Sequence, residues 1–435
     1  MVKVSGKSAC WLAWALAAAA CGGESQHNPA GSPPEATGAG GQAHAGGTGV
    51  SKPGSGVATA GQASTSRGGS GGNGATVGGT ATGGELGQPA GAAPEGGSPE
   101  GSGAGASDPG EGGSAGEPMP SCDPIVFDDP DFEYAVRASV NKPTGALTSA
   151  DVVGLTFVAA SGVKSIRGAE CLTDLTDFDI GGLPWGDVSD LSPLAPLKKL
   201  ETVDVGHNPL ASVAPLGDLP QLKQLFMSSV PTSLDLAPLA GAPALGLLYL
   251  QKDTVVDLEP LGAVKTLVTL NLRQSTVLKP TGAAKLKSVL DLDATGVFDD
   301  VTPLAALTQL QKLRVGLKPT QGFAALATLK NLIFLDAQRA SIADLAPLAG
   351  MTKLQQFTLS GNQVSDLTPL QSLAQLREAV LVDNQVQDLS PLVKNASFAD
   401  GASLYVQKNP YDCAAQAANV SDLQGRGVEV FSDCQ

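Results

Sequence analysis

Histidine is scarce in this 435-residue chain, which contains three copies of it. His27 and His44 lie in a glycine-rich stretch, and His207 lies in a segment of different composition. No Ser/His/Asp or Cys/His set can be assembled around His207, and the chain has neither an HExxH nor a P-loop sequence. We therefore expect a non-enzymatic protein without a cofactor, with His207 as a solvated surface residue. A carbohydrate-active enzyme of the cell wall is a less favoured alternative, because a glycosidase needs paired carboxylates in a deep groove.

Positive charge is also scarce. The chain has 27 lysines and arginines against 42 aspartates and glutamates, which gives a formal net charge of −15. Phosphate backbones repel such a chain, and no basic patch with interleaved aromatic residues is present. The composition therefore argues against a nucleic-acid partner and indicates a soluble, self-repelling chain.

Aromatic residues are absent from residues 22–116, which hold 32 of the 54 glycines. Large aliphatic residues are almost absent there as well, so this stretch cannot bury enough apolar surface to offset its chain entropy. The sequence predicts a disordered linker, with the foldable part beginning near residue 121. A coil of about 100 residues has a root-mean-square span of roughly 50–60 Å, which suits a tether. Low-complexity drift without a selected length is the alternative.

The first twenty residues have the features of an export signal. Lys3 and Lys7 precede the apolar run ACWLAWALAAAA, which is too short to span a bilayer as a stable helix. Small residues then lead to Cys21 and two glycines. This arrangement resembles a bacterial lipoprotein signal, in which the cysteine is lipidated and becomes the mature N-terminus. The sequence departs from that pattern at Ala18, where a larger aliphatic residue is usual, so an ordinary secretory signal is the alternative.

Either kind of signal predicts a location outside the cytoplasm. With lipid on Cys21 the resemblance implies a membrane-anchored protein of the cell envelope. The glycine after Cys21 offers no strong cue for retention in the inner membrane, so we expect the outer membrane, facing either the cell surface or the periplasm. If the lipid signal is not used, we expect a secreted protein.

Cysteine usage agrees with export. Removal of the signal takes away Cys10, and a lipidated Cys21 leaves four cysteines, at positions 122, 171, 413 and 434. Four cysteines allow three pairings, of which the sequence-local one is Cys122–Cys171 with Cys413–Cys434. A zinc site is the competing use, but it favours closely spaced CxxC pairs and the chain has none. We expect two disulfides and no bound metal.

A short string of the form DLxPL recurs along the foldable part at steps that are mostly 22 or 23 residues. Its prolines are Pro193, Pro215, Pro238, Pro260, Pro303, Pro347, Pro369 and Pro391, with a degenerate copy at Pro280. A second pattern lies between the copies, and it is spelled by Leu354, Phe357, Leu359, Asn362 and Val364. A fixed period in this range indicates a solenoid of stacked turns. Together the two patterns resemble the leucine-rich repeat, in the 22-residue form of internalin-like bacterial surface proteins, over residues 155–410.

The resemblance implies an α/β solenoid. Its curved parallel sheet lies on the concave side, turns and 3-10 segments lie on the convex side, and caps cover both ends. It also implies that Asn208, Asn362, Asn384 and Asn409 bond backbone groups of adjacent turns. Other residues take that place in several turns, where we expect a weaker ladder: Asp253, Ser275, Thr295 and Ala340. The predicted organisation is signal 1–20, lipidated N-terminus and linker 21–121, N-terminal cap 122–154, repeats 155–410 and C-terminal disulfide cap 411–435.

Local sequence predicts the caps and two irregular turns. Asp129 and Pro130 begin a predicted helix in the N-terminal cap, and the C-terminal cap is expected to hold a helix from about 412 to 424 and a strand at 428–430. Extra residues around Trp185 predict a bulging loop. The string GLKPTQGF lacks the DLxPL pattern, so we expect an irregular outer side there.

The strand residues that alternate with the buried leucines should form two outward rows on the concave face. One predicted row is Asp179, Asp204, Phe226, Tyr249, Asn271, Asp291, Arg314, Asp336, Thr358, Val380 and Tyr405. The other is Asp177, Thr202, Gln224, Leu247, Thr269, Val289, Lys312, Phe334, Gln356, Glu378 and Ser403. Phe226, Leu247 and Tyr249 should form an apolar patch that is either a contact surface or a set of side chains packed on one another.

We therefore expect the concave face to bind a protein, with a surface polymer such as a polysaccharide as a possible ligand. The candidate binding residues are Phe226, Leu247, Tyr249, Asn271, Arg314, Phe334, Asp336 and Tyr405. A purely structural envelope protein is the main alternative function.

Overall fold

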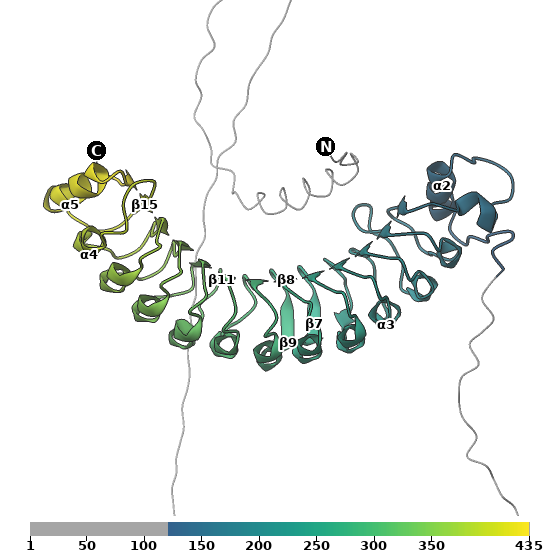
Figure 1. The fold of residues 1–435 in the computed structure, drawn as a ribbon, viewed down its shortest axis with the longest axis horizontal. Coiled ribbons are helices and arrows are strands. Elements are labelled where there is room, and N and C mark those ends of the chain that lie inside the picture. The colour runs from purple at the N-terminus through teal and green to yellow at the C-terminus, as the bar shows by residue number, and fades with distance from the viewer. Residues whose placement is uncertain (1–120, 435) are drawn as a thin grey trace, which may run out of the picture. The chain divides into compact units, whose positions relative to one another are not determined.

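The structure is a computed structural model that describes residues 121–434. The predicted signal, Cys21 and almost all of the predicted linker lie outside these residues, so lipid attachment and the tether stay predictions. In the described part no helix is long and apolar enough to cross a membrane. The described residues form an arc of stacked turns, with the sheet on the inner side and short helices on the outer side (Figure 1).

The inner side is a single sheet in which every neighbouring pair of strands is parallel. Its thirteen strands, in spatial order, are β1 (Phe157–Ala159), β2 (Asp177–Asp179), β3 (Thr202–Asp204), β4 (Gln224–Phe226), β6 (Leu247–Tyr249), β8 (Thr269–Asn271), β10 (Asp291–Asp293), β11 (Lys312–Gly316), β12 (Phe334–Gln338), β13 (Gln356–Thr358), β14 (Glu378–Val380), β15 (Ser403–Tyr405) and β16 (Glu429–Phe431). The central residue of each strand points inward. Leu270, Leu292 and Leu313 are in register and fully buried, so the turns share one apolar core.

The outer side consists of short helices at the DLxPL strings and in the caps. The 3-10 segments are η1 (Ser149–Val152), η2 (Ala169–Cys171), η3 (Ser192–Leu194), η4 (Ala237–Gly241), η5 (Glu259–Ala263), η6 (Pro280–Lys285), η7 (Thr302–Ala306), η8 (Phe323–Thr328), η9 (Ala346–Gly350) and η10 (Thr368–Ser372), and the α-helical ones are α3 (Ala214–Gly217) and α4 (Ser390–Lys394). Proline stands in the first turn of most of these segments, where its missing N–H costs nothing.

The aspartate of DLxPL has a role that the sequence analysis missed. Its carboxylate accepts a hydrogen bond from the backbone N–H two residues later, as at Asp344 to Ala346 and Asp366 to Thr368, both at 2.8 Å. The aspartate thus satisfies an N–H that the helix start leaves without a partner.

The asparagine ladder is confirmed. Asn362 accepts from the backbone N–H groups of Ala340 and Ile342 at 3.0 Å, and its amide donates to the carbonyls of Ala337 and Leu359. Asn208, Asn384 and Asn409 make equivalent contacts with neighbouring turns.

A second sheet, which was not predicted, forms in the middle turns of the array, after strands β4, β6 and β8 of the inner sheet. It pairs β5 (Ser233–Leu234), β7 (Thr254–Asp257) and β9 (Thr276–Lys279) in parallel. The β-branched runs TVVD and TVL favour extended backbone here. Backbone pairing thus supplements the ladder in the turns where Asp253 and Ser275 replace asparagine.

The two irregular turns have different outcomes. The loop after β2 is present, and it exposes Leu183 and Trp185. The expected irregularity at GLKPTQGF is wrong on the outer side, because η8 forms there as in the other turns. Gly322, with a φ of 76°, precedes η8 in the left-handed conformation and starts the helix without the usual aspartate.

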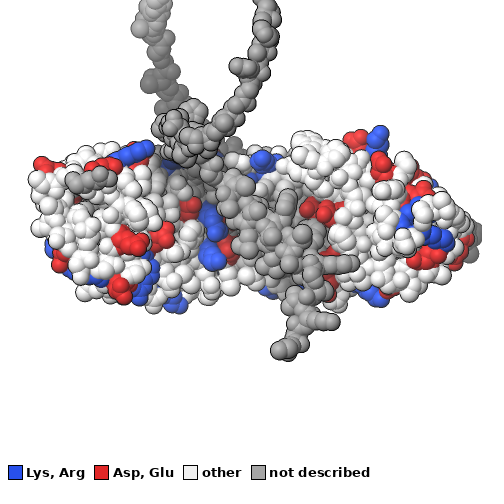
Figure 2. All heavy atoms as spheres, turned by 90° about the horizontal axis from the view of Figure 1, so that it is seen from above, with Lys and Arg blue, Asp and Glu red and all other residues white. Residues whose placement is uncertain are grey.

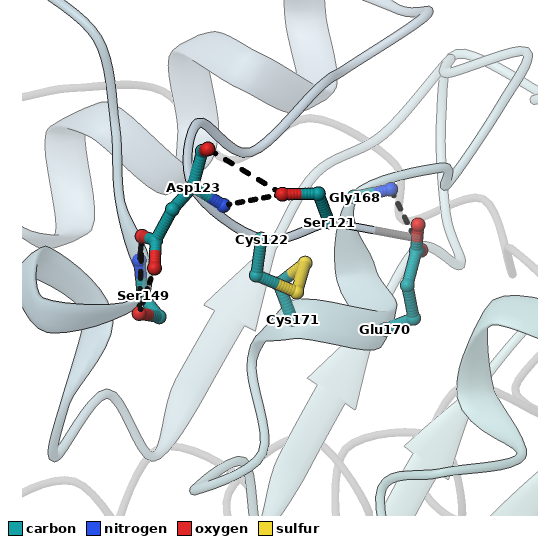
Figure 3. The surroundings of a disulfide bond; sticks show 7 residues. All are labelled: Ser121, Cys122, Asp123, Ser149, Gly168, Glu170 and Cys171. Atoms are coloured by element: carbon teal, nitrogen blue, oxygen red, sulfur yellow. Dashed lines mark hydrogen bonds between the residues drawn. A yellow bond between two sulfur atoms is a disulfide. The ribbon is translucent and has the colours of Figure 1, made fainter. Parts of the chain in front are cut away.

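The N-terminal cap is built around α2 (Pro130–Ser139), whose N-cap residue Asp129 accepts from the N–H groups of Asp131 and Phe132. Phe132 and Val136 are fully buried and cover the first turn of the core. The predicted Cys122–Cys171 disulfide is present and joins this cap to η2 (Figure 3).

The C-terminal cap contains α5 (Cys413–Gly425) and β16, close to the predicted positions. The predicted Cys413–Cys434 disulfide is present and ties the start of α5 to the segment after β16. The residue boundaries predicted for the linker, caps and repeats stay predictions.

Candidate functional site

The first and third residues of the inner strands form the two outward rows on the concave face. Strand register confirms these rows except at β10. There Asp291 lies in the row of first strand residues, beside Thr269. Asp293 lies in the row of third strand residues, beside Asn271, at the place predicted for Asp291. Val289 is fully buried and does not belong to either row. The error arose because VLDLD alternates in two possible phases, and only Leu292 aligns with the leucines of the adjacent turns.

All eight candidate binding residues lie in the outward rows, but the structure does not bring them together. They form separate groups along β4 to β15. The rings of Phe226 and Tyr249 lie 5.2 Å apart, with Leu247 on the same strand as Tyr249. These side chains are half-buried, so they both pack on one another and present an edge to solvent.

The second group lies at the middle of the sheet. The Arg314 guanidinium lies 4.9 Å from the centre of the Phe334 ring and pairs with Asp291 at 3.1 Å. Asp336 lies beside Arg314 in the register and accepts a hydrogen bond from the Gln338 side-chain amide. Burial raises the pKa of the Asp336 carboxyl. Arg314 therefore already has anionic and aromatic partners within the chain.

The third group lies at the C-terminal end. Tyr405 stacks on Phe431 with 4.4 Å between ring centres and 5° between ring planes. Phe431 was missed from the sequence because the rows were counted only as far as β15. The strand predicted at 428–430 was the available signal, since one more residue in that strand brings Phe431 beside Tyr405.

The N-terminal end of the face is acidic. Asp179 and Asp204 lie side by side in the register, and none of the ion pairs in residues 121–434 involves either one. Burial raises the pKa of Asp204 to about 7, with a further contribution from the negative charge of Asp179, while the Gly206 N–H opposes the shift. Burial likewise raises the pKa of Asp179 to about 6. These carboxyls are thus held where ionisation is costly.

The loop after β2 adds an aromatic stack at this end. The Trp185 indole lies against the His207 imidazole, with ring centres 5.5 Å apart, and Trp185 remains 60% exposed. His207 is half-buried rather than solvated as expected, and burial, followed by the charge of Lys252, lowers its pKa. The loop was predictable from the sequence but the stack was not, because the two rings come from successive turns.

Acidic residues dominate the outward rows as a whole. The acidic members are Asp177, Asp179, Asp204, Asp291, Asp293, Asp336, Glu378 and Glu429, and the basic members are Lys312 and Arg314. Figure 2 looks onto the concave side and shows acidic side chains in separate groups between broad uncharged areas. The face therefore offers negative charge and aromatic edges to a partner.

The described residues contain no candidate metal site, and a small hollow lies in the N-terminal cap. Residues 121–434 contain no group of three His, Cys, Asp or Glu side chains placed to hold a metal ion. A hollow of about 200 Å³ lies beside the Cys122–Cys171 disulfide, lined by residues that include Pro124, Arg167 and Glu170. This volume is below that of an ordinary small-molecule pocket, and the hollow is in the cap rather than on the sheet.

Comparison with solved structures supports the fold assignment. The internalin InlF from Listeria monocytogenes is 26% identical, with a TM-score of 0.63 over 72% of this chain and 92% of that one. The protein has an internalin-like leucine-rich-repeat fold. A leucine-rich-repeat protein of Leptospira interrogans shares the fold at 19% identity, with a TM-score of 0.50 over 62% of this chain and 75% of that one. No family model matches the chain, and no curated relative is found.

Proposed function

We propose that this leucine-rich-repeat protein is a non-enzymatic binding protein of the cell envelope that holds a protein partner on its concave face. The observation that carries the proposal is the inner sheet itself, whose thirteen parallel strands present two unbroken outward rows. Those rows include half-buried aromatic side chains at Phe226, Tyr249 and Tyr405. Rigid aromatic anchors with little rotamer freedom to lose are the side chains that protein interfaces favour.

Lipid on Cys21 would anchor the domain, and residues 21–121 would act as the tether. Two disulfides support an oxidising location, because such bonds are rare in proteins that remain in the cytoplasm. The outer membrane is the proposed site of anchoring. Without lipid, the same domain would act as a secreted binding protein.

Site-specific photo-crosslinking in the cells that express the full chain tests the binding face. A photoreactive phenylalanine analogue is placed at Gln224 or Gln356, which are exposed on the concave rows, and at Gln309, which is exposed after η7 on the other side. A protein crosslinked from both concave positions and not from Gln309 supports the proposal. Equal yields from all three positions, or none from the concave pair, would contradict it.

Substitution of the aromatic pair then measures its contribution. Phe226→Ala with Tyr249→Ala should weaken binding of the crosslinked partner by at least about tenfold, the effect of losing a hot spot. The melting temperature should change little, because both side chains are half-buried and lie outside the leucine core. Leu278→Ala is the matched control, since Leu278 is 58% exposed on β9 and not on the concave face. Unchanged affinity in the double variant would remove this patch from the interface.

A further inference from the structure

Resting on the proposed function, we infer that the N-terminal half of the concave face takes a cationic segment of the protein partner. The segment would be extended and would present arginine or lysine side chains next to apolar ones. Its docking surface is the row formed by Asp179, Asp204, Phe226 and Tyr249, edged by the Trp185–His207 stack. We call this set the acidic–aromatic row.

Strand register brings the four row residues together. Asp179 is opposite Asp204, Asp204 is opposite Phe226, and Phe226 is opposite Tyr249. Adjacent strands are about 4.8 Å apart, so the row extends over about 14 Å. An extended peptide rises about 3.3 Å per residue, so about four residues could lie across the row. Their side chains would meet carboxylates at one end and aromatic rings at the other.

Two glycines make room for the innermost carboxylate. A Cβ on Gly181 would lie 2.3 Å from Asp204 Oδ1, and one on Gly206 would lie 3.3 Å from the same atom. Asp204 Oδ1 accepts from the Gly206 N–H at 3.0 Å, and the residue is 9% exposed. Any larger residue at 181 would displace this carboxylate, so the local backbone is shaped to keep an acid at the floor of the row.

The described residues supply no cation to these acids, although they do so elsewhere on the same face. Asp291 pairs with Arg314 at 3.1 Å and with Lys312 at 3.8 Å. In residues 121–434 no lysine or arginine pairs with Asp179 or Asp204, and the inner-sheet strands β1, β2, β3, β4, β6, β8 and β10 contain neither residue type. Two neighbouring, largely buried carboxylates without a counter-ion create a negative potential that favours binding of a cation. A guanidinium or ammonium group of the partner would supply the missing counter-ion.

One aromatic pair adjoins the carboxylates in the strand register, and a second follows Asp204 along the chain. His207 follows Asp204 by three residues, so the Trp185–His207 stack is within about 10 Å of the acids along the chain. The exposed indole can receive a cation over its face, and the Phe226–Tyr249 pair can receive an aliphatic stem or a second apolar side chain. Acid beside aromatic is the combination that suits arginine in particular, because its planar group both stacks and forms paired hydrogen bonds.

A defined peptide pair tests the inference with the full chain. With the predicted signal 1–20 removed on export, Trp185 is the one tryptophan of the three that remains, so its fluorescence reports from the edge of the row. The probes are an acetylated octapeptide of alternating arginine and leucine and the same peptide with neutral citrulline in place of arginine. At pH 8 the arginine peptide should bind at least tenfold more tightly and change the Trp185 emission.

Charge-matched variants distinguish the effect of the acids in the row on affinity from the effect of the net charge of the protein. Asp179→Asn with Asp204→Asn should lower affinity for the arginine peptide at least fivefold and bring it close to that of the citrulline peptide. Glu259→Gln with Asp299→Asn removes the same charge from exposed acids paired with Lys285 and Lys318, and it should leave affinity nearly unchanged. Thermal melts establish that each variant is folded. Trp185→Ala, with binding followed by calorimetry, should also weaken the arginine peptide.

Several results would overturn the inference. Equal affinity for both peptides, an equal loss in both charge variants, or tighter binding of a neutral chito-oligosaccharide would each do so. Self-association of the chain abolished by Asp179→Asn with Asp204→Asn would identify a second copy as the occupant instead. If a crosslinked partner binds the Asp179→Asn, Asp204→Asn variant as well as the parent, the concave binding role stands and the cationic segment is wrong. If neither crosslinking nor the arginine peptide gives a signal, both proposals are wrong.

Discussion

Replacing Asp253 by asparagine should stabilise the solenoid at neutral pH. Asp253 occupies the ladder position that asparagine fills in other turns, and it is 2% exposed. Its Oδ1 accepts from the Val230 N–H at 2.7 Å, but its Oδ2 has no hydrogen-bond partner in residues 121–434. The amide of Asn362 at the equivalent position donates to two carbonyls. An ionised carboxylate cannot donate, so only the protonated form of Asp253 can reproduce that contact.

The magnitude follows from the pKa of Asp253. Burial raises this pKa from 3.8 to about 7, against the opposing effect of the Val230 N–H. Between these values the folded state binds more protons than the unfolded state, so the contribution of Asp253 is full below about pH 4 and is lost as the pH rises through about 7. A shift of about three units corresponds to about 4 kcal/mol. Asp253→Asn removes this loss, so its gain should be small near pH 4 and reach about 4 kcal/mol at pH 8.

Denaturant and thermal melts of parent and variant at pH 4.5, 6 and 8 measure the effect. In a domain of this size about 4 kcal/mol corresponds to roughly 6 °C in melting temperature. Asp179 and Asp204 also have raised pKa values, but they contribute to both proteins, so the difference between the curves isolates Asp253. Asn362→Asp is the reciprocal control and should be more destabilising at pH 8 than at pH 4.5. A stability gap that is the same at every pH would refute the reasoning.

Two further changes test the ladder and the cap. Asn384→Ala should cost about 2 kcal/mol in urea unfolding, because it leaves the buried Val364 N–H without its partner and removes one of the two side-chain donors to each of the Leu359 and Leu381 carbonyls; a loss below about 1 kcal/mol would show that the ladder contributes little. Cys413→Ser with Cys434→Ser opens a bridge between residues 21 apart in sequence, worth about 3 kcal/mol. Its effect on hydrogen exchange should be concentrated in α5 and β16, and equal acceleration in α2 would contradict a local capping role.

Sequence alone predicted the parts of this protein that repeat. The LxxLxL spacing placed Leu270 and Leu313 in the shared core, and both are fully buried. The resemblance to the leucine-rich repeat implied the ladder contact of Asn362, which the structure shows. Such features are predictable because a sequence motif that repeats in phase occupies an equivalent position in each stacked turn. The disulfide pairing was predictable for a related reason, as each bridge joins the nearest available cysteine.

The errors occur where a turn departs from its neighbours. At VLDLD two phases of alternation satisfy local sequence equally well, and only the alignment of Leu292 with adjacent turns selects one. The sheet of β5, β7 and β9 requires three successive turns to remain extended together. The Phe431–Tyr405 stack likewise depends on two strands that are distant in sequence and adjacent in space.

Sequence by itself therefore determined the stacked turns, the identity of the core and, outside β10 and β16, the residues that point outward. Tertiary structure decided the state of those outward residues. In the sequence Asp204 is a strand residue outside the DLxPL strings. In the structure it is a buried acid without an ion-pair partner in residues 121–434, because Gly181 of the previous turn leaves room for its carboxylate. Asp253 takes the place of asparagine with one carboxylate oxygen unsatisfied in residues 121–434, because neighbouring turns bury it. The physical reason is that burial and hydrogen bonding of a side chain are set by the turns on either side, while local periodicity sets only its direction.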